Sequence, residues 1–280
     1  MYYLLLIIAT VLFSSQFLFN QKYQQEAGSK LNASLVFSII TSLVSVVLMF
    51  IIGGFKIDFS VFSLIIAFIY AITLILYVIA SIKAFSVVNL SVYSVFAMLG
   101  GMLLPFIYGI TFGEPLTPNK IICCILIGIS LFLTTDKNSG NKKGKIYYIA
   151  VFFLNGLVGV LSTIHQSNEN AVDSSSFMGL TQACVFFIAL IIFLVSRQKK
   201  PTINVKTICF SSGYALFSGI ANLLALIALT KLPASVQYPI ITGGTMVFSL
   251  FISLLRKEKI TIKNILSTII AFVASIIIAL

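Results

Sequence analysis

The sequence predicts an all-α integral membrane protein with ten transmembrane helices in two five-helix inverted repeats. Three observations carry this prediction. Apolar residues make up 59% of the 280 residues and charged residues only 9%, with a mean hydropathy of +1.11, whereas soluble domains are about half apolar and about a quarter charged. Ten apolar runs alternate with short polar breaks, and the two halves of the chain resemble each other.

Each apolar run is long enough for one helix. A span takes about 20 apolar residues, or about 28 with its loop, so the chain accommodates ten spans and leaves no room for an appended soluble domain. The predicted helices cover residues 2–20, 33–52, 62–82, 86–109, 120–135, 146–167, 175–196, 206–229, 234–255 and 262–280. The first run lacks a small-residue cleavage site and is expected to be a retained span. We therefore predict a first repeat at 1–135, a basic cytoplasmic linker at 136–145 and a second repeat at 146–280.

The basic residues indicate how the chain lies in the membrane. Fifteen of the 18 Lys and Arg residues fall in odd-numbered breaks and three in even-numbered breaks. Because loops rich in Lys and Arg stay cytoplasmic, the odd breaks, including Asp136–Lys145, are predicted inside and both termini outside. This sidedness accounts for the net charge of +11 without a nucleic-acid partner. Together with the apolar spans, this distribution predicts a multi-pass protein of the plasma membrane, surrounded by the lipid bilayer.

No ionised side chain is predicted near the middle of a span, because all seven Asp and Glu residues lie in or beside polar breaks. A charge in hydrocarbon is costly and usually functional. Its absence argues against a carboxylate-driven proton pump, a redox pump and a metal-dependent intramembrane enzyme. The four cysteines lie in apolar runs, which disfavours a disulfide framework or a zinc site. We expect neither a metal nor a cofactor.

An internal repeat supports the division into halves. A shift of 144 residues superimposes Tyr70 on Tyr214, Ser91 on Ser235, Gly100 on Gly244, Glu114 on Glu258 and Thr117 on Thr261. Each half contains five spans, an odd number, so the second half enters the membrane from the opposite side. Inverted repeats of this kind are typical of secondary transporters that work by alternating access.

Several segments resemble a known family. The breaks before the fifth and tenth spans read GEPLTPNKI and KEKITIKNI, the tight hairpins read AFSVVNLSVYSVF and ALTKLPASVQYPI, and the first span contains SSQFLFNQKY. Together these segments resemble the EamA-like ten-helix branch of the drug/metabolite transporter superfamily. The resemblance implies a central cavity lined by the first, third, fourth, sixth, eighth and ninth helices, and it is the sole basis for expecting export rather than import.

Polar residues in those six spans are the candidate substrate-binding residues, because an amide or hydroxyl in hydrocarbon needs a partner. The candidates are Gln16, Asn20, Tyr70, Tyr93, Asn155, His165, Tyr214, Asn222, Gln237 and Tyr238. The alternative for each is a packing role or, for the tyrosines, a place at the membrane interface. His165, the only histidine, is the one candidate for proton coupling. Its counterpart in the first repeat, Asn20, does not titrate, which favours uncoupled transport.

Five further residues are predicted to have structural or gating roles. Glu114 and Glu258 precede the fifth and tenth helices, where a carboxylate favours the positive end of a helix and locks the loop. Gly100 and Gly244 lie within the fourth and ninth helices and predict either close helix packing or a hinge. Pro239 predicts a kink in the ninth helix.

These features favour a secondary transporter of a small neutral or zwitterionic metabolite, such as an amino acid. The spans contain amides, hydroxyls and tyrosines but no carboxylate or base to match a fully charged solute. Tyrosine rings also attract organic cations, so an organic-cation or drug transporter of the same fold remains open. A non-transporting membrane scaffold, which needs no polar cavity, is the other alternative. An intramembrane enzyme needs a catalytic dyad at depth, which is not present in the spans.

Overall fold

The computed structural model describes residues 2–112, 117–134, 142–196, 201, 203–229 and 234–277, and within these it describes only the backbone of 120, 142–145, 223, 226, 227, 229 and 234–239. The described residues form ten α-helices. They are α1 (Tyr2–Ala27), α2 (Leu31–Ile52), α3 (Val61–Ala84), α4 (Leu90–Thr111), α5 (Pro118–Thr134), α6 (Lys142–Gln166), α7 (Ser174–Val195), α8 (Val205–Leu229), α9 (Ala234–Leu255) and α10 (Ile262–Ile277). Each lies close to a predicted span.

Capping residues explain where the helix boundaries differ from the prediction. α1 extends to Ala27 instead of residue 20 and stops at Gly28, whose φ of +79° suits glycine. α4 begins at Leu90 instead of residue 86, because the Asn89 side chain accepts a hydrogen bond from the N–H of Val92 at 2.9 Å. α3 begins after Ser60, which accepts from the N–H of Ser63.

The helices have the length and surface of membrane spans. Six of the described helices, α1–α4, α6 and α7, are long and apolar enough to cross a membrane, and shorter apolar helices lie at 121–134, 240–255 and 262–277. Large apolar side chains such as Ile65 and Phe187 are more than half exposed on the outside. A surface of this kind suits hydrocarbon and not water. The chain is an all-α, multi-pass membrane protein.

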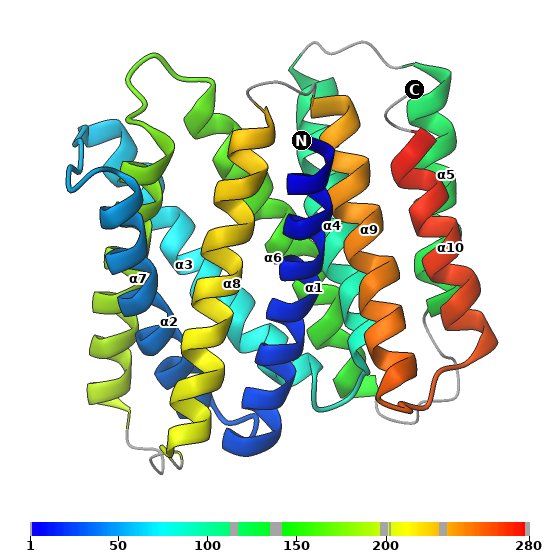
Figure 1. The fold of residues 1–280 in the computed structure, drawn as a ribbon, viewed down its shortest axis with the longest axis horizontal. Coiled ribbons are helices and arrows are strands. Elements are labelled where there is room, and N and C mark those ends of the chain that lie inside the picture. Colours follow the sequence, from blue (N-terminus) through cyan, green and yellow to red (C-terminus); the bar gives the residue numbers. More distant parts are fainter. Residues whose placement is uncertain are drawn as a thin grey trace.

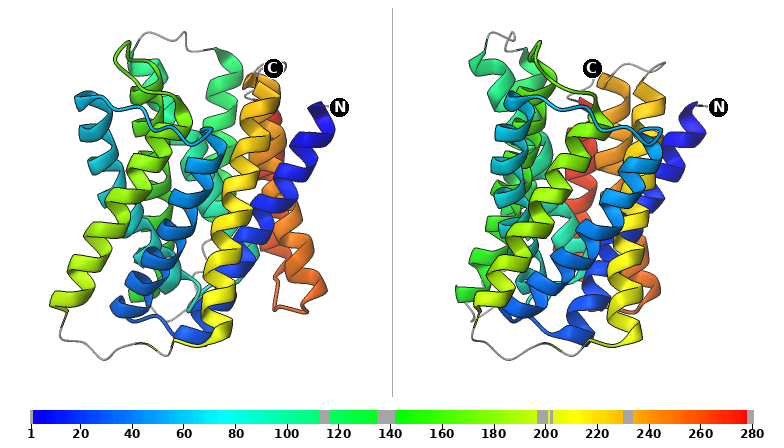
Figure 2. Two further views of the ribbon diagram at one scale, coloured as in Figure 1. Left: turned by 60° about the vertical axis from the view of Figure 1, so that its left-hand side comes forward. Right: turned by 90° about the vertical axis from the view of Figure 1, so that its left-hand side faces the viewer.

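Successive helices alternate in direction, so the connections gather at two ends (Figures 1 and 2). The end with loops 28–30, 85–89 and 256–261 is called the basic end here, because most of the described Lys and Arg residues lie there. The opposite end, called the far end, carries loops 53–60 and 167–173, the start of α1 and the end of α10 (Figure 1). The predicted odd breaks that the structure describes share the basic end.

The helix contacts follow a two-fold pattern. α1 packs on α8 and α9, whereas α6 packs on α3 and α4. Exchanging each helix of the first five with its counterpart in the second five converts one set of contacts into the other. α2 packs on α7 and α5 on α10, which are pairs that the exchange leaves unchanged. This is the contact pattern expected of inverted repeats; the division at residues 135 and 146 remains a prediction.

Two glycines of the repeat mark close helix contacts. A Cβ on Gly100 of α4 would lie 2.0 Å from the carbonyl oxygen of Phe152 on α6. A Cβ on Gly244 of α9 would lie 2.6 Å from the Thr10 side chain on α1. Both glycines therefore let backbones approach at equivalent interfaces of the two halves. The side chain of Pro239, where a kink was expected, lies outside the described residues.

Candidate functional site: a central cavity

A cavity of about 450 Å³ lies between eight helices, α1–α4 and α6–α9. α5 and α10 pack against each other outside it. Among the described residues the cavity wall contains amides, hydroxyls, tyrosines and apolar side chains, and no Asp, Glu, Lys, Arg or His. The wall therefore provides hydrogen bonds and aromatic faces, but no formal charge.

The structure places five of the predicted binding residues in this wall: Gln16, Tyr70, Asn155, Tyr214 and Asn222. They come from four different helices and from both halves of the chain. Tyr70 on α3 and Tyr214 on α8, which the 144-residue shift superimposes, line the same cavity. The repeat thus presents one tyrosine from each half.

The amides of the wall are held in different ways. Asn155 Nδ2 donates to the carbonyl oxygen of Ala97 on α4 at 2.6 Å. Asn222 Nδ2 donates to the carbonyl oxygen of Ser218, four residues earlier on α8, at 2.8 Å. Gln16 is 7% exposed, and its Oε1 has no hydrogen-bond partner in the part of the chain that the structure describes. A buried acceptor without a partner is costly, so Gln16 is a candidate contact for a solute.

Aromatic contacts fix the two repeat-related tyrosines. The Tyr70 ring meets Phe177 of α7 edge-on at a centroid distance of 5.6 Å. The Tyr214 ring meets Phe37 of α2 at 5.0 Å. Since edge-to-face contacts restrain ring orientation, both tyrosines are preorganised in the wall.

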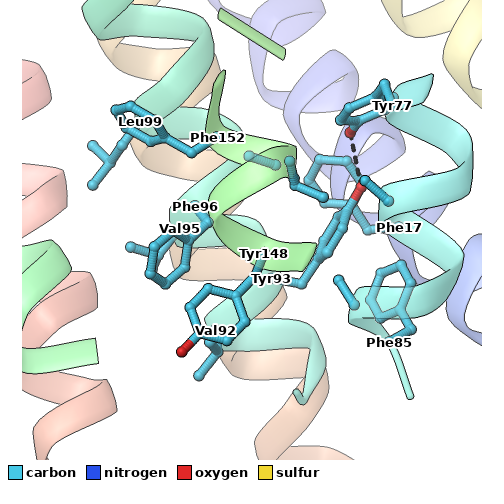
Figure 3. Packing of buried hydrophobic residues seen from close by; sticks show 14 of the residues in the cluster. Phe17, Tyr77, Phe85, Val92, Tyr93, Val95, Phe96, Leu99, Tyr148 and Phe152 are labelled. Carbon is cyan, nitrogen blue, oxygen red and sulfur yellow. Dashed lines mark hydrogen bonds between the residues drawn. The ribbon is translucent and has the colours of Figure 1, made fainter. Parts of the chain in front are cut away.

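Two predicted binding residues lie outside the wall, toward the basic end. Tyr93 is fully buried at the start of α4, and its hydroxyl forms a hydrogen bond of 2.8 Å with Tyr77 (Figure 3). The same hydroxyl forms a second hydrogen bond of 2.8 Å with Ser81. Asn20 is 1% exposed, in the last two turns of α1. Neither residue lines this cavity in the structure, because packed rings fill the interior at this depth, and a binding role for them stays a prediction.

His165 also lies outside the cavity wall. The ring is 2% exposed and stacks on Phe177 at a centroid distance of 3.7 Å. His165 Nε2 forms a hydrogen bond of 2.9 Å with Ser63 Oγ, which accepts from the N–H of Val172 at 3.1 Å. His165 therefore joins α6 to α3, α7 and the 167–173 loop, which corresponds to the packing role given above as the alternative to binding.

The prediction missed two helices that line the cavity. α2 contributes Ser38, Thr41 and Ser45, and α7 contributes Met178 and Gln182. The helix set implied by the family resemblance left out both helices. Gln182 lies within an apolar run, and an amide at such a position was the sequence feature that could have indicated that α7 lines the cavity. Gln237 and Tyr238 were also predicted to bind, and their side chains lie outside the described residues.

A buried aromatic cluster closes the cavity toward the basic end. Tyr77 lines the cavity and contacts Tyr93 below it. The Tyr93 ring stacks on Phe85 at 4.0 Å and meets Phe17 edge-on at 5.1 Å (Figure 3). These rings belong to one continuous core that continues through Phe96 and reaches α6. The cluster separates the cavity from the basic end.

A charged network lies beyond this cluster, at the basic end itself. Glu258 Oε1 lies 2.9 Å from Arg256 Nη1 and accepts from Gln21 Nε2 at 3.3 Å, while Oε2 accepts from the N–H of Leu90 at 3.3 Å. Arg256 also donates to Gln21 Oε1. These four residues, called the Glu258 latch here, tie the α9–α10 loop to α1 and α4.

The latch corrects one detail of the prediction. Glu258 was expected to favour the start of the tenth helix, but its carboxylate caps α4 instead. Thr261 supplies the cap of α10, since its Oγ1 accepts from the N–H of Asn264 at 3.3 Å. Glu114, the predicted counterpart in the first repeat, lies outside the described residues.

The cavity reaches the far end. Its wall includes Ile52 at the end of α2, Gln166 at the end of α6, and Ser174 and Ser175 at the start of α7. Asp173 holds the start of α7, because its Oδ2 accepts from the N–H groups of Ser175 at 2.8 Å and Ser176 at 3.0 Å. Burial raises the pKa of Asp173, but these hydrogen bonds outweigh it and lower the pKa overall. The mouth of the cavity is thus bounded by a well-capped helix.

The comparisons with known proteins agree with this architecture. Residues 142–280, from the start of α6 to the end of the chain, match the model of the EamA-like transporter family. No curated protein matches the sequence. A central cavity at the interface of two inverted halves is also the usual place for the substrate site of a secondary transporter. The chain belongs to the EamA-like transporter family, within the drug/metabolite transporter superfamily.

Proposed function

We propose that this protein is a secondary transporter that moves a small neutral or zwitterionic metabolite across the plasma membrane by alternating access. The observation that carries the proposal is the 450 Å³ cavity, whose described wall combines polar and apolar side chains and contains no charged residue. A cavity of this size accommodates a metabolite of amino-acid dimensions. An uncharged wall binds a neutral solute without leaving a buried ion unpaired. A membrane scaffold has no need of such a cavity.

In the alternating-access cycle that we propose, this structure is one state. With the basic end in the cytoplasm, as the positive-inside rule requires, the cavity opens to the outside. The aromatic cluster around Tyr93 and the Glu258 latch close the cytoplasmic side. Transport then requires both to separate while the mouth between α2, α6 and α7 closes. Export is the direction suggested by the family resemblance.

The transport step is proposed to be uncoupled from protons. Among the described residues the cavity wall contains no group that titrates near neutral pH. His165, the only histidine, is buried between aromatic rings and bonded to Ser63 outside the wall. Movement down the solute gradient needs no change of charge in the site.

An organic cation is the second candidate solute, favoured by a specific observation. Tyr70, Tyr77 and Tyr214 line the cavity together with Phe13 and Phe17. Aromatic faces attract organic cations by about 0.5–2 kcal/mol each.

Transport from loaded proteoliposomes tests the function. Vesicles containing the purified protein and a mixture of amino acids, polyols and organic amines are diluted into solute-free buffer, and the solutes released are identified by mass spectrometry. We expect release of a small subset faster than from protein-free vesicles. Ser218→Trp, which fills the cavity from α8, is the matched control and should abolish that release at equal folded yield. Equal release by parent and Ser218→Trp would refute transport through this cavity.

A further inference from the structure

We propose that the cavity selects its solute by a hydrogen-bond-donating amine: an ammonium group is held by side-chain oxygens and tyrosine rings, and carboxylates and phosphates are excluded. The inference rests on the proposal that this cavity is the solute site, and it specifies the chemistry of that site. Zwitterionic amino acids and protonated organic amines both carry this group, whereas neutral metabolites without an amine do not.

Each of the two asparagines of the wall has one of its two side-chain N–H groups bonded to the backbone. Asn155 Nδ2 donates to the Ala97 carbonyl oxygen, and Asn222 Nδ2 donates to the Ser218 carbonyl oxygen. A carbonyl oxygen only accepts, so the NH₂ end of each amide must face it, whichever way the amide was first assigned. Both lone pairs of Oδ1 and one N–H of each amide are left for a solute, so each asparagine offers more acceptor sites than donors.

The same holds for Thr41 on α2, and a glutamine adds a free acceptor. The Thr41 hydroxyl donates to the carbonyl oxygens of Phe37 at 2.8 Å and Ser38 at 3.2 Å, so only lone pairs remain on its oxygen. Gln16 Oε1 is buried in the wall without a partner among the described residues. An ammonium group with three N–H donors satisfies several such oxygens at once.

The excess of acceptors has a general cause. In the interior of a helix every backbone N–H is already bonded, while each carbonyl oxygen retains a second lone pair. A polar side chain in a dry helix bundle therefore finds acceptors to donate to, and it is left with its own oxygen unpaired. The bonded amides and hydroxyls of the wall therefore add acceptor oxygens to the cavity.

The aromatic rings of the wall point the same way. The described wall contains no charged residue of either sign, so neither a carboxylate nor an ammonium group finds a counter-ion there, and the uncharged groups of the wall decide between them. An ammonium group finds the faces of Tyr70, Tyr77 and Tyr214 in addition to the oxygens. The carboxylate of a zwitterion would have to stay at the mouth, near the exposed serines that begin α7.

A matched set of indoles tests this selectivity directly. Tryptamine carries an ammonium group, N-acetyltryptamine carries a neutral amide in its place, and indole-3-propionate carries a carboxylate. The chain contains no Trp, so the fluorescence of the bound indole is measured without protein background, with empty micelles as the blank. We expect tryptamine to bind about tenfold more tightly than N-acetyltryptamine, and indole-3-propionate to bind more weakly than both.

Charge substitutions at Gln16 test whether the preference comes from this wall. Gln16→Glu should tighten tryptamine binding about tenfold, and Gln16→Lys should abolish it and make indole-3-propionate the preferred ligand. Gln25→Glu and Gln25→Lys, which place the same charges on an exposed position of the same helix, should leave all three affinities unchanged.

Three results would overturn the inference: equal binding of tryptamine and N-acetyltryptamine, no binding of any of the three indoles, or equal effects of the Gln16 and Gln25 substitutions. The proposed function is judged separately, by solute release from proteoliposomes. If the protein releases only solutes that lack an amine, the proposed transport function holds and the amine selectivity is wrong. If it binds tryptamine but releases no solute, the amine selectivity holds and the transport function is wrong.

Discussion

The backbone N–H of Leu90, the first residue of α4, donates to the carboxylate of Glu258 in the α9–α10 loop at 3.3 Å. A residue of the second half thereby caps a helix of the first half. Because a carboxylate stabilises the positive end of a helix and Arg256 holds this one in place at 2.9 Å, the contact joins the two halves at the end where the cavity is closed. It is the natural point to test how that end opens.

Glu258→Gln should loosen the basic end. The substitution keeps the shape of the side chain but removes the charge that pairs with Arg256 and caps α4, a loss of about 1.5–3 kcal/mol. A cysteine at Ser81, beside Tyr93, placed in a background without the four native cysteines, should then react several-fold faster with a thiol reagent. Glu26→Gln, which removes the more exposed pair with Lys206 at the same end, is the control. Equal reactivity in the two variants would exclude the latch as a closing contact.

The orientation in the membrane is tested by two exposed positions. Lys56 lies at the far end and Ser86 at the basic end. In intact cells, Lys56→Cys should react with an impermeant maleimide, whereas Ser86→Cys should react only after permeabilisation, because the basic end is predicted to be cytoplasmic. Native cysteines are again replaced. The reverse labelling pattern would place the cavity mouth on the cytoplasmic side.

Substitutions in the cavity wall should separate recognition from stability. Gln16→Ala and Asn222→Ala should reduce transport about tenfold or more with little change in melting temperature, because these amides face the cavity. Tyr93→Phe removes the hydroxyl that bonds to Tyr77 and Ser81 below the cavity, and it should lower the melting temperature without changing solute selectivity. Normal transport by the two Ala variants, together with lower stability, would make the amides packing residues.

His165→Gln should preserve transport. Glutamine keeps a hydrogen-bonding group near Ser63 but does not titrate. Proteoliposomes under an imposed pH gradient provide the measurement, and the variant should equilibrate solute at nearly the parental rate. If the parent concentrates solute under this gradient and His165→Gln only equilibrates it, His165 is a proton site and the uncoupled mechanism is wrong.

Two glycines provide a matched test of helix packing. Gly100→Ala should destabilise the protein by about 1–3 kcal/mol or more, because the new Cβ would lie 2.0 Å from the Phe152 carbonyl oxygen and force α4 and α6 apart. Gly128→Ala on α5 has no atom within 4 Å of the new Cβ and should be neutral or stabilising. Thermal unfolding of the two variants in detergent compares them. A hinge role for Gly100 without a packing role predicts equal stability and altered transport.

The sequence determined the number, length and alternation of the helices. These properties are local, because the thickness of the hydrocarbon sets the length of each apolar run and polar breaks must reach water. It also determined which connections share the basic end, and the repeat that relates Tyr70 to Tyr214.

Only the tertiary structure decided which polar residues face the cavity. Helices that are apolar on all sides carry little signal for their rotation about their own axes, since lipid and protein interior favour the same residues. Packing of α4 and α6 turned Tyr93 and His165 out of the cavity wall, and packing of α2 and α7 brought Thr41 and Gln182 into it. Glu258 caps α4 for the same reason, because a loop's partner across the bundle depends on how distant helices assemble and not on its neighbours in sequence.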